Sequence, residues 1–149
     1  MAKIKIALIL LCAVAIFLLT GCAGGGGSVH IPPEYIEANS PTAIKMELTV
    51  CGAGSGKLNE RYTNITLYYR ISGQEEFTSV SMIPTSITKK RLYVQATLPP
   101  FDVEDNTFVE YYIDFLFDGH YNKREIVRVP VKKVKQPVQT VGENGENSI

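Results

Sequence analysis

The thiol of Cys22 is the group whose surroundings in the sequence most plainly imply chemistry. Lys3 and Lys5 give the chain a positive start, and Ile6–Leu19 is an unbroken apolar run. The small residues Thr20-Gly21 separate this run from the cysteine. A charged start, an apolar run and small residues at a cut are typical of an export signal. We therefore expect the segment before Cys22 to be a cleaved signal peptide.

Leu19-Thr20-Gly21-Cys22 resembles the lipobox of bacterial lipoproteins. The resemblance implies that residues 1–21 are the signal peptide, that a diacylglycerol is attached to the Cys22 thiol, and that the new amino terminus is acylated. Each buried methylene contributes about 0.8 kcal/mol, so two or three acyl chains would hold the protein at a bilayer. Ala23 stands where an aspartate would retain an enteric lipoprotein in the inner membrane, which favours the outer membrane. The expected membrane partner is therefore reached through the lipid on Cys22.

The alternative is that the apolar run is a retained transmembrane helix. The run is shorter than the roughly 20 residues that a spanning helix needs, and the glycine-rich stretch after it has no positive flank. We expect Gly24–Ser28 to be a flexible spacer. Residues 22–40, which are rich in proline, are expected to form a tether with at most a short edge strand, and Ile31 and Ile36 are possible core contacts.

Removal of Lys3 and Lys5 with the signal leaves 13 basic residues against 15 acidic ones in a mature chain of 128 residues. This length fits one domain, and the near-neutral charge lacks the basic footprint of a nucleic-acid-binding protein. Cys51 is then the one cysteine besides the lipidated Cys22, so we expect no internal disulfide. We also expect no cofactor. The stability of the domain must come from a packed core.

Apolar and polar residues alternate along several segments, a pattern typical of half-buried strands. The predicted strands are Ala43–Cys51, Asn64–Ser72, Phe77–Ile83, Leu92–Leu98, Thr107–Asp118 and a last strand that contains Val127, Val129 and Val131. Between and after them we expect a polar connection at Pro84–Lys90, a hairpin turn at Gly119–Asn122, no helix in the mature chain, and a disordered tail over residues 136–149.

Six or seven short strands over about 100 residues predict an all-β, antiparallel immunoglobulin-like sandwich, which we place at residues 41–135. Four segments carry a further pattern: Ile65-Thr66-Leu67-Tyr68-Tyr69-Arg70, Phe77 with Val80 and Met82, Ala96-Thr97-Leu98-Pro99, and Glu110-Tyr111-Tyr112-Ile113. Together they resemble the fibronectin type III-like modules of bacterial surface proteins, and the resemblance implies the fold but no particular function. Phe115 departs from that pattern, where a small residue is usual.

Tyr111, with Ile113 two residues later, also fits the tyrosine corner of such sandwiches. In that motif the phenol hydroxyl bonds to the chain a few residues upstream. We therefore expect the Tyr111 hydroxyl to have a local backbone partner.

No segment carries a recognisable catalytic motif. Gly52–Lys57 is rich in glycine, but Leu58 stands where a phosphate-binding loop needs Ser or Thr. Cys51 could be a reactive thiol or form an intermolecular disulfide; we expect it to pack as a small apolar residue. His30 and His120 are far apart and belong to no nucleophile–base or metal-ligand pattern. We therefore predict a domain that is not an enzyme.

Asp102, Glu104, Asp105 and Asn106 place four oxygen-bearing side chains in the loop Phe101–Asn106. The spacing is not that of an EF-hand, and no glycine is placed for its sharp bend. Acidic and amide side chains commonly cap turns. We predict a capped turn here, with a calcium site as the alternative, and no metal site elsewhere.

The most informative predicted surface arises from strand pairing. In an immunoglobulin-like sandwich the segments Ile65–Ile71, Val109–Phe117 and Ile126–Val131 would lie side by side as the C, F and G strands. Their outward residues would then form one candidate binding face: Thr66, Tyr68, Arg70, Tyr112, Asp114, Leu116 and Arg128. An exposed apolar patch with a charged rim can mark a contact with a protein or a glycan. The alternative is a set of cross-strand pairs that only stabilises the sheet.

The anchor and the lack of a catalytic set predict a membrane-anchored envelope lipoprotein whose non-catalytic sandwich is a protein-binding or spacer module. A carbohydrate-binding accessory module is the alternative, because fibronectin-like modules often accompany polysaccharide-degrading enzymes. Against it, the chain has no tryptophan.

Overall fold

The computed structural model describes residues 25–51, 57–105 and 107–134. The predicted signal peptide, Cys22 and the tail from residue 136 lie outside these ranges, as does most of the Gly52–Lys57 loop. Within the described ranges, no helix is both long enough and apolar enough to cross a bilayer.

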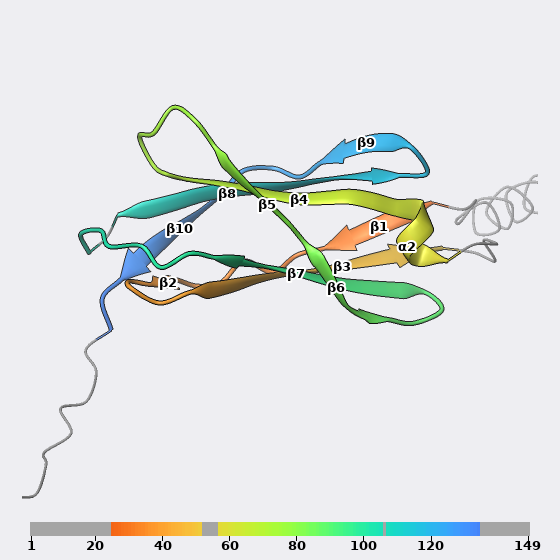
Figure 1. Cartoon of the computed structure of the whole chain (residues 1–149), viewed down its shortest axis with the longest axis horizontal. Coiled ribbons are helices and arrows are strands. Elements are labelled where there is room, and N and C mark those ends of the chain that lie inside the picture. The colour runs from red at the N-terminus through yellow and green to blue at the C-terminus, as the bar shows by residue number, and fades with distance from the viewer. Residues whose placement is uncertain (1–24, 52–56, 106, 135–149) are drawn as a thin grey trace, which may run out of the picture.

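Two β-sheets pack face to face as the layers of a sandwich (Figure 1). In spatial order, the four-stranded sheet contains β1 (Gly26–Val29), β3 (Thr42–Val50), β7 (Arg91–Leu98) and β6 (Ile83–Ile87). The six-stranded sheet contains β2 (Ile36–Glu37), β10 (Val127–Lys132), β8 (Phe108–Phe117), β4 (Tyr62–Ile71) and β5 (Thr78–Ser81), and β9 (His120–Lys123) pairs with β8 beside β10. One helical turn, α2 (Leu58–Arg61), precedes β4.

The strand order is that of an immunoglobulin-like sandwich. The order β1-β3-β7-β6 corresponds to strands A, B, E and D, and β10-β8-β4 corresponds to G, F and C. The first strand divides between the sheets, because β1 pairs with β3 and β2 pairs in parallel with β10. The predicted fold class is confirmed, and so is the predicted neighbourhood of the C, F and G segments.

The core lies between the sheets and is built from the alternating inward residues of the long strands. The large fully buried side chains include Ile36, Ile44, Leu48, Leu67, Leu92, Leu98, Val109, Tyr111, Ile113 and Val131. The inward rows predicted for β3, β7 and β8 therefore face the core, and Ile36 makes the core contact expected of it. The other proposed contact is wrong: the side chain of Ile31 is 83% exposed.

The glycine run before β3 is a strand, not a free spacer, over Gly26–Val29. These residues pair with Val50 to Glu47, and the Cys51 amide donates to the Gly25 carbonyl at 2.9 Å. The sandwich therefore begins about fifteen residues before the predicted boundary at residue 41. A side chain at position 26 would have no room, because an added Cβ would lie 2.5 Å from Tyr62 Oη.

Three further expectations differ from the structure. The predicted polar connection Pro84–Lys90 contains most of β6, an exposed edge strand in which proline is tolerated. A single helical turn, α2, also lies where no helix was expected. The expected turn at Gly119–Asn122 begins one residue earlier, since Asp118 and Gly119 have φ of 48° and 80°. Two consecutive positive φ values are typical of a tight hairpin turn.

The two ends of the described sandwich carry different segments (Figure 1). β1 begins at the end that carries α2, the turn before β7 and the β8–β9 turn. β10 finishes at the opposite end, beside the turn after β4 and the loop before β8. We call these the tether end and the far end.

Candidate functional site

The outer face of the six-stranded sheet brings the predicted binding residues of β4 and β8 together. The register pairs Tyr68 with Tyr112, and Thr66 with Asp114. The two tyrosine rings are stacked, with centroids 4.8 Å apart and an interplanar angle of 9°. A cross-strand aromatic pair of this kind stabilises a sheet and leaves the ring edges and hydroxyls at the surface.

Cationic side chains cover this aromatic pair and its neighbour Phe77. Lys123 Nζ lies 4.0 Å from the centroid of Tyr112, and the guanidinium carbon of Arg70 lies 4.3 Å from the centroid of Phe77. Phe77 in turn meets Tyr112 edge-on, with centroids 5.1 Å apart. These contacts are cation–π interactions, which hold long side chains in place over a ring.

Glu110 connects the cations of neighbouring strands. Its Oε2 is 2.9 Å from Arg70 Nη2, and its Oε1 is 4.0 Å from Arg128 Nε. Hydrogen bonds from Arg70 and from the Ser72 hydroxyl lower the pKa of Glu110. Arg128 also lies over the ring of Phe108 at 4.1 Å. The face is therefore an alternating array of aromatic rings, guanidinium groups and carboxylates.

Asp114 is the one outward carboxylate on β8 that is buried, at 9% exposure. It lies beside a register shift between Thr63 and Thr66, where Asn64 has a φ of 53°. A shallow cavity of about 190 Å³ opens there, and Tyr121 donates to Asp114 Oδ2 at 3.1 Å. Burial raises the pKa of Asp114, although the hydrogen bond from Tyr121 opposes the shift.

The predicted face residues therefore lie on one surface, with Leu116 half-buried at its β9 side. We name this surface the aromatic face; its members are Tyr68, Arg70, Phe77, Glu110, Tyr112, Asp114, Leu116, Tyr121, Lys123 and Arg128. The sequence prediction lacked four of these members: Phe77, Glu110, Tyr121 and Lys123. The last two belong to β9, which was expected to be turn and connection, and Phe77 precedes β5 outside the regular alternation.

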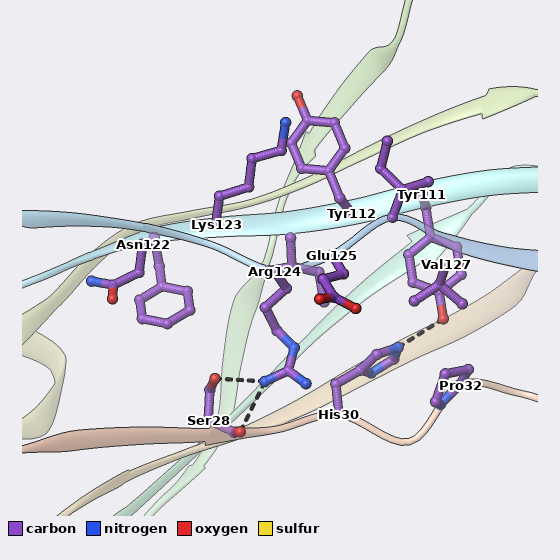
Figure 2. Close-up of a pocket in the computed structure, with 13 residues that line it drawn as sticks. Ser28, His30, Pro32, Tyr111, Tyr112, Asn122, Lys123, Arg124, Glu125 and Val127 are labelled. Atoms are coloured by element: carbon purple, nitrogen blue, oxygen red, sulfur yellow. Dashed lines mark hydrogen bonds between the residues drawn. The ribbon is translucent and has the colours of Figure 1, made fainter.

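A second concave site lies along the opening between β1 and the segment that joins β9 to β10. Its cavity has a volume of about 430 Å³, and Figure 2 shows His30, Arg124, Glu125 and Asn122 around it. The imidazole Nδ1 of His30 is 2.6 Å from the Lys45 carbonyl, and Nε2 is 2.7 Å from the Tyr111 hydroxyl. A carbonyl can only accept, so Nδ1 carries a proton; in the neutral imidazole, Nε2 then accepts from the Tyr111 hydroxyl.

The lowered pKa of His30 and its two internal contacts favour a neutral, structural histidine. Burial lowers its pKa, and the nearby charge of Arg124 lowers it further, while the bond to Lys45 acts in the opposite direction. Both ring nitrogens are occupied, so neither is available as a catalytic base. The predicted tyrosine corner is wrong, because the Tyr111 hydroxyl bonds to a side chain 81 residues away and not to the nearby backbone.

Arg124 connects β1 to the six-stranded sheet across the same opening. Its amide donates to the Ile113 carbonyl at 2.8 Å, and its Nη1 donates to the Ser28 carbonyl and hydroxyl at 2.9 and 2.7 Å. Figure 2 shows this guanidinium reaching down to Ser28. The polar groups of this cavity are therefore engaged mainly in joining the first strand to the sandwich.

In the described part of the chain, neither Cys51 nor the acidic loop forms a reactive or metal-binding site. Cys51 is free there but exposed, which corrects the expectation that it packs as an apolar residue. Among the described residues, no group of three His, Cys, Asp or Glu could hold a metal ion. In the acidic loop, Glu104 pairs with Lys133 at 3.8 Å, and Asp105 accepts from the Lys133 amide at 3.1 Å.

Comparisons with known proteins add little to this geometry. No protein-family model matches the chain, and no curated protein matches it in sequence. Among solved structures, murine CRIg is similar over 73% of this chain and 99% of its own, with 8% sequence identity and a TM-score of 0.36. A likeness at this level says nothing of what the chain binds.

Proposed function

We propose that the protein is a bacterial envelope lipoprotein, held to a membrane through lipid on Cys22, whose sandwich binds a protein partner through the aromatic face. The lipobox-like sequence supports the anchor. The aromatic face supports the binding role, because Tyr and Arg are enriched among the residues that dominate protein interfaces. The single observation that carries the proposal is the pre-ordered Tyr68–Tyr112 stack under Lys123.

The same observation favours a protein over a glycan as the ligand. A sugar ring packs on an open aromatic face, whereas Tyr112 is covered by Tyr68 and Lys123. Ring edges, hydroxyls and alternating charges remain, and these suit a polar, hydrogen-bonded protein surface. A carbohydrate-binding accessory module is therefore the second candidate.

The experiment is crosslinking of the full-length protein in intact cells, followed by purification of the crosslinked complexes. We expect Tyr68→Ser with Tyr112→Ser to reduce the yield of the principal partner at least about tenfold, the loss expected when hot-spot residues are truncated. Tyr93→Ser, on β7 of the other sheet, is the matched control and should keep the partner. Equal yields of the partner from the wild-type protein, the double tyrosine variant and Tyr93→Ser would exclude the aromatic face as the binding surface.

The anchor is tested separately with Cys22→Ser. We expect this variant to lose the mass of the lipid and to leave the membrane fraction. Unchanged mass and fractionation would overturn the lipoprotein part of the proposal and would leave the aromatic face untested by that result alone.

A glycan array probed with the detergent-solubilised full-length protein tests the second candidate. Glycan binding that is lost in the double tyrosine variant would replace the protein partner with a carbohydrate.

A further inference from the structure

The two ends of the sandwich carry opposite charge. The tether-end segments 57–61, 88–91 and 118–120 contain five basic residues and two acidic ones: Lys57, Arg61, Lys89, Lys90 and Arg91 against Glu60 and Asp118. The far-end segments 37–41, 72–77, 99–107 and 132–134 contain six acidic residues and two basic ones: Glu37, Glu75, Glu76, Asp102, Glu104 and Asp105 against Lys132 and Lys133. The long axis therefore runs from a net positive end to a net negative one.

Backbone hydrogen bonds hold the basic segments of the tether end close to the start of β1. The Val50 amide donates to the Lys90 carbonyl at 3.2 Å, and the adjacent Cys51 amide donates to the Gly25 carbonyl at 2.9 Å. The Asp118 amide donates to the Arg61 carbonyl at 2.9 Å. The segments that carry these basic residues therefore lie at the same end as the start of the described chain (Figure 1).

We propose that the tether end lies against an anionic lipid surface, so that the sandwich stands upright on the membrane. This inference depends on the lipid anchor at Cys22 proposed above. Cys22 is three residues before Gly25, so even a fully extended chain places the acylated cysteine within about 11 Å of the tether end. The anchor therefore brings this end, and not the far end, to the bilayer.

The electrostatics favour the same orientation. Lys89 and Lys90 are exposed, so their charges can approach phosphate headgroups. The other three cations of this end form ion pairs: Lys57 with Glu60, Arg61 with Asp118 and Arg91 with Glu47. The ten-residue strands β4 and β8 set the far end about 33 Å away, beyond a Debye length of about 8 Å at physiological salt. The acidic far end is therefore not repelled by the anionic bilayer. In this orientation the aromatic face is open to a partner that approaches along the membrane plane.

Two single-cysteine proteins test the orientation in the full, acylated chain. In a Cys51→Ser background, Asn59→Cys places a probe on α2 at the tether end, and Glu75→Cys places one in the turn at the far end. Each protein carries a fluorescent label on its single cysteine and is reconstituted in vesicles that contain a lipid with a nitroxide quencher on its headgroup. The anionic vesicles are phosphatidylcholine with about 30% phosphatidylglycerol, and the neutral vesicles are phosphatidylcholine alone. We expect quenching at position 59 to be at least about twofold stronger in the anionic vesicles, and position 75 to remain unquenched.

Charge reversal provides the matched pair of variants. Lys89→Glu with Lys90→Glu should reduce quenching at position 59 in anionic vesicles to the level in neutral ones. Lys132→Glu with Lys133→Glu makes the same charge change at the far end and should leave quenching at position 59 unchanged. High salt should likewise reduce quenching at position 59 in anionic vesicles, because it screens exposed charges.

The outcomes separate this inference from the anchor. Failure of the acylated protein to float with either type of vesicle would overturn the anchor and the orientation together. Flotation with equal quenching at positions 59 and 75, or equal effects of the two charge reversals, would overturn the orientation and leave the anchor in place.

Discussion

Tyr111 and Tyr112 are neighbours in β8, yet they lie on opposite sides of one sheet and their environments differ. Tyr111 is fully buried, and its hydroxyl donates to His30, while burial raises its pKa strongly. Tyr112 is half-exposed and is held by Tyr68, Phe77 and Lys123. The inner tyrosine connects distant parts of the chain, whereas the outer one orders a surface, so the same residue type has a different structural role on each side of the sheet.

Truncation of each tyrosine gives the largest contrast. We expect Tyr111→Ala to lower the free energy of unfolding by about 3–5 kcal/mol, because it leaves a large cavity in the core. Tyr112→Ala should cost only about 1 kcal/mol, the value of a lost aromatic pair at a surface. Urea denaturation measures both, and equal losses would show that the outer stack is part of the core.

Addition of a methyl group tests how tightly the inner side is packed. Gly26→Ala would bring its Cβ to 2.5 Å from Tyr62 Oη and 2.9 Å from the Phe117 ring, so we expect a loss of about 1–3 kcal/mol. Gly25→Ala is the control, since nothing lies within 4 Å of its added Cβ and its effect should be near zero. If the two variants were equally stable in thermal unfolding, β1 would not be packed against those rings.

The smallest expected effect is a pH dependence that arises from His30 on the inner side. The pKa of His30 in the folded protein is below its ordinary value of 6.5, so the unfolded chain binds the proton first as the pH falls. The stability should be full above about pH 6.5 and decline toward pH 5, before most carboxylates titrate. The groups around the imidazole are the Lys45 carbonyl, the Tyr111 hydroxyl and the Arg124 guanidinium.

Unfolding measured between pH 7 and pH 5 checks this expectation. His30→Gln should remove the decline, and Tyr112→Ser on the outer face should leave it unchanged. A decline that persists in His30→Gln would assign the proton uptake to another group.

Much of the fold could be predicted from local alternation. Ile44, Met46 and Leu48 face the core as their spacing predicts, and the long β8 has the expected inward row. Placing the C, F and G segments side by side then assigned Tyr68 and Tyr112 to one face. Period-2 patterns settle which side of a strand a residue occupies, and this is enough to assemble most of the aromatic face.

The rest depends on contacts between segments that are distant in the sequence. Gly26 follows a pattern typical of a loop, and it belongs to a strand only because β3, Tyr62 and Phe117 lie against it. The partner of Tyr111 is 81 residues away, and Lys123 reaches Tyr112 because a tight turn folds β9 back along β8. The local periodicity of a sequence does not predict such long-range contacts.

Pro84, in the exposed edge strand β6, affects whether a strand of another molecule can pair with this edge. A proline has no amide hydrogen, so it cannot donate a hydrogen bond to a neighbouring strand. The register also shifts between Pro84 and Ser86. A second molecule that approaches the β6 edge therefore meets an interrupted row of hydrogen-bonding groups. Both features disfavour the addition of a strand from another copy at this edge of the four-stranded sheet.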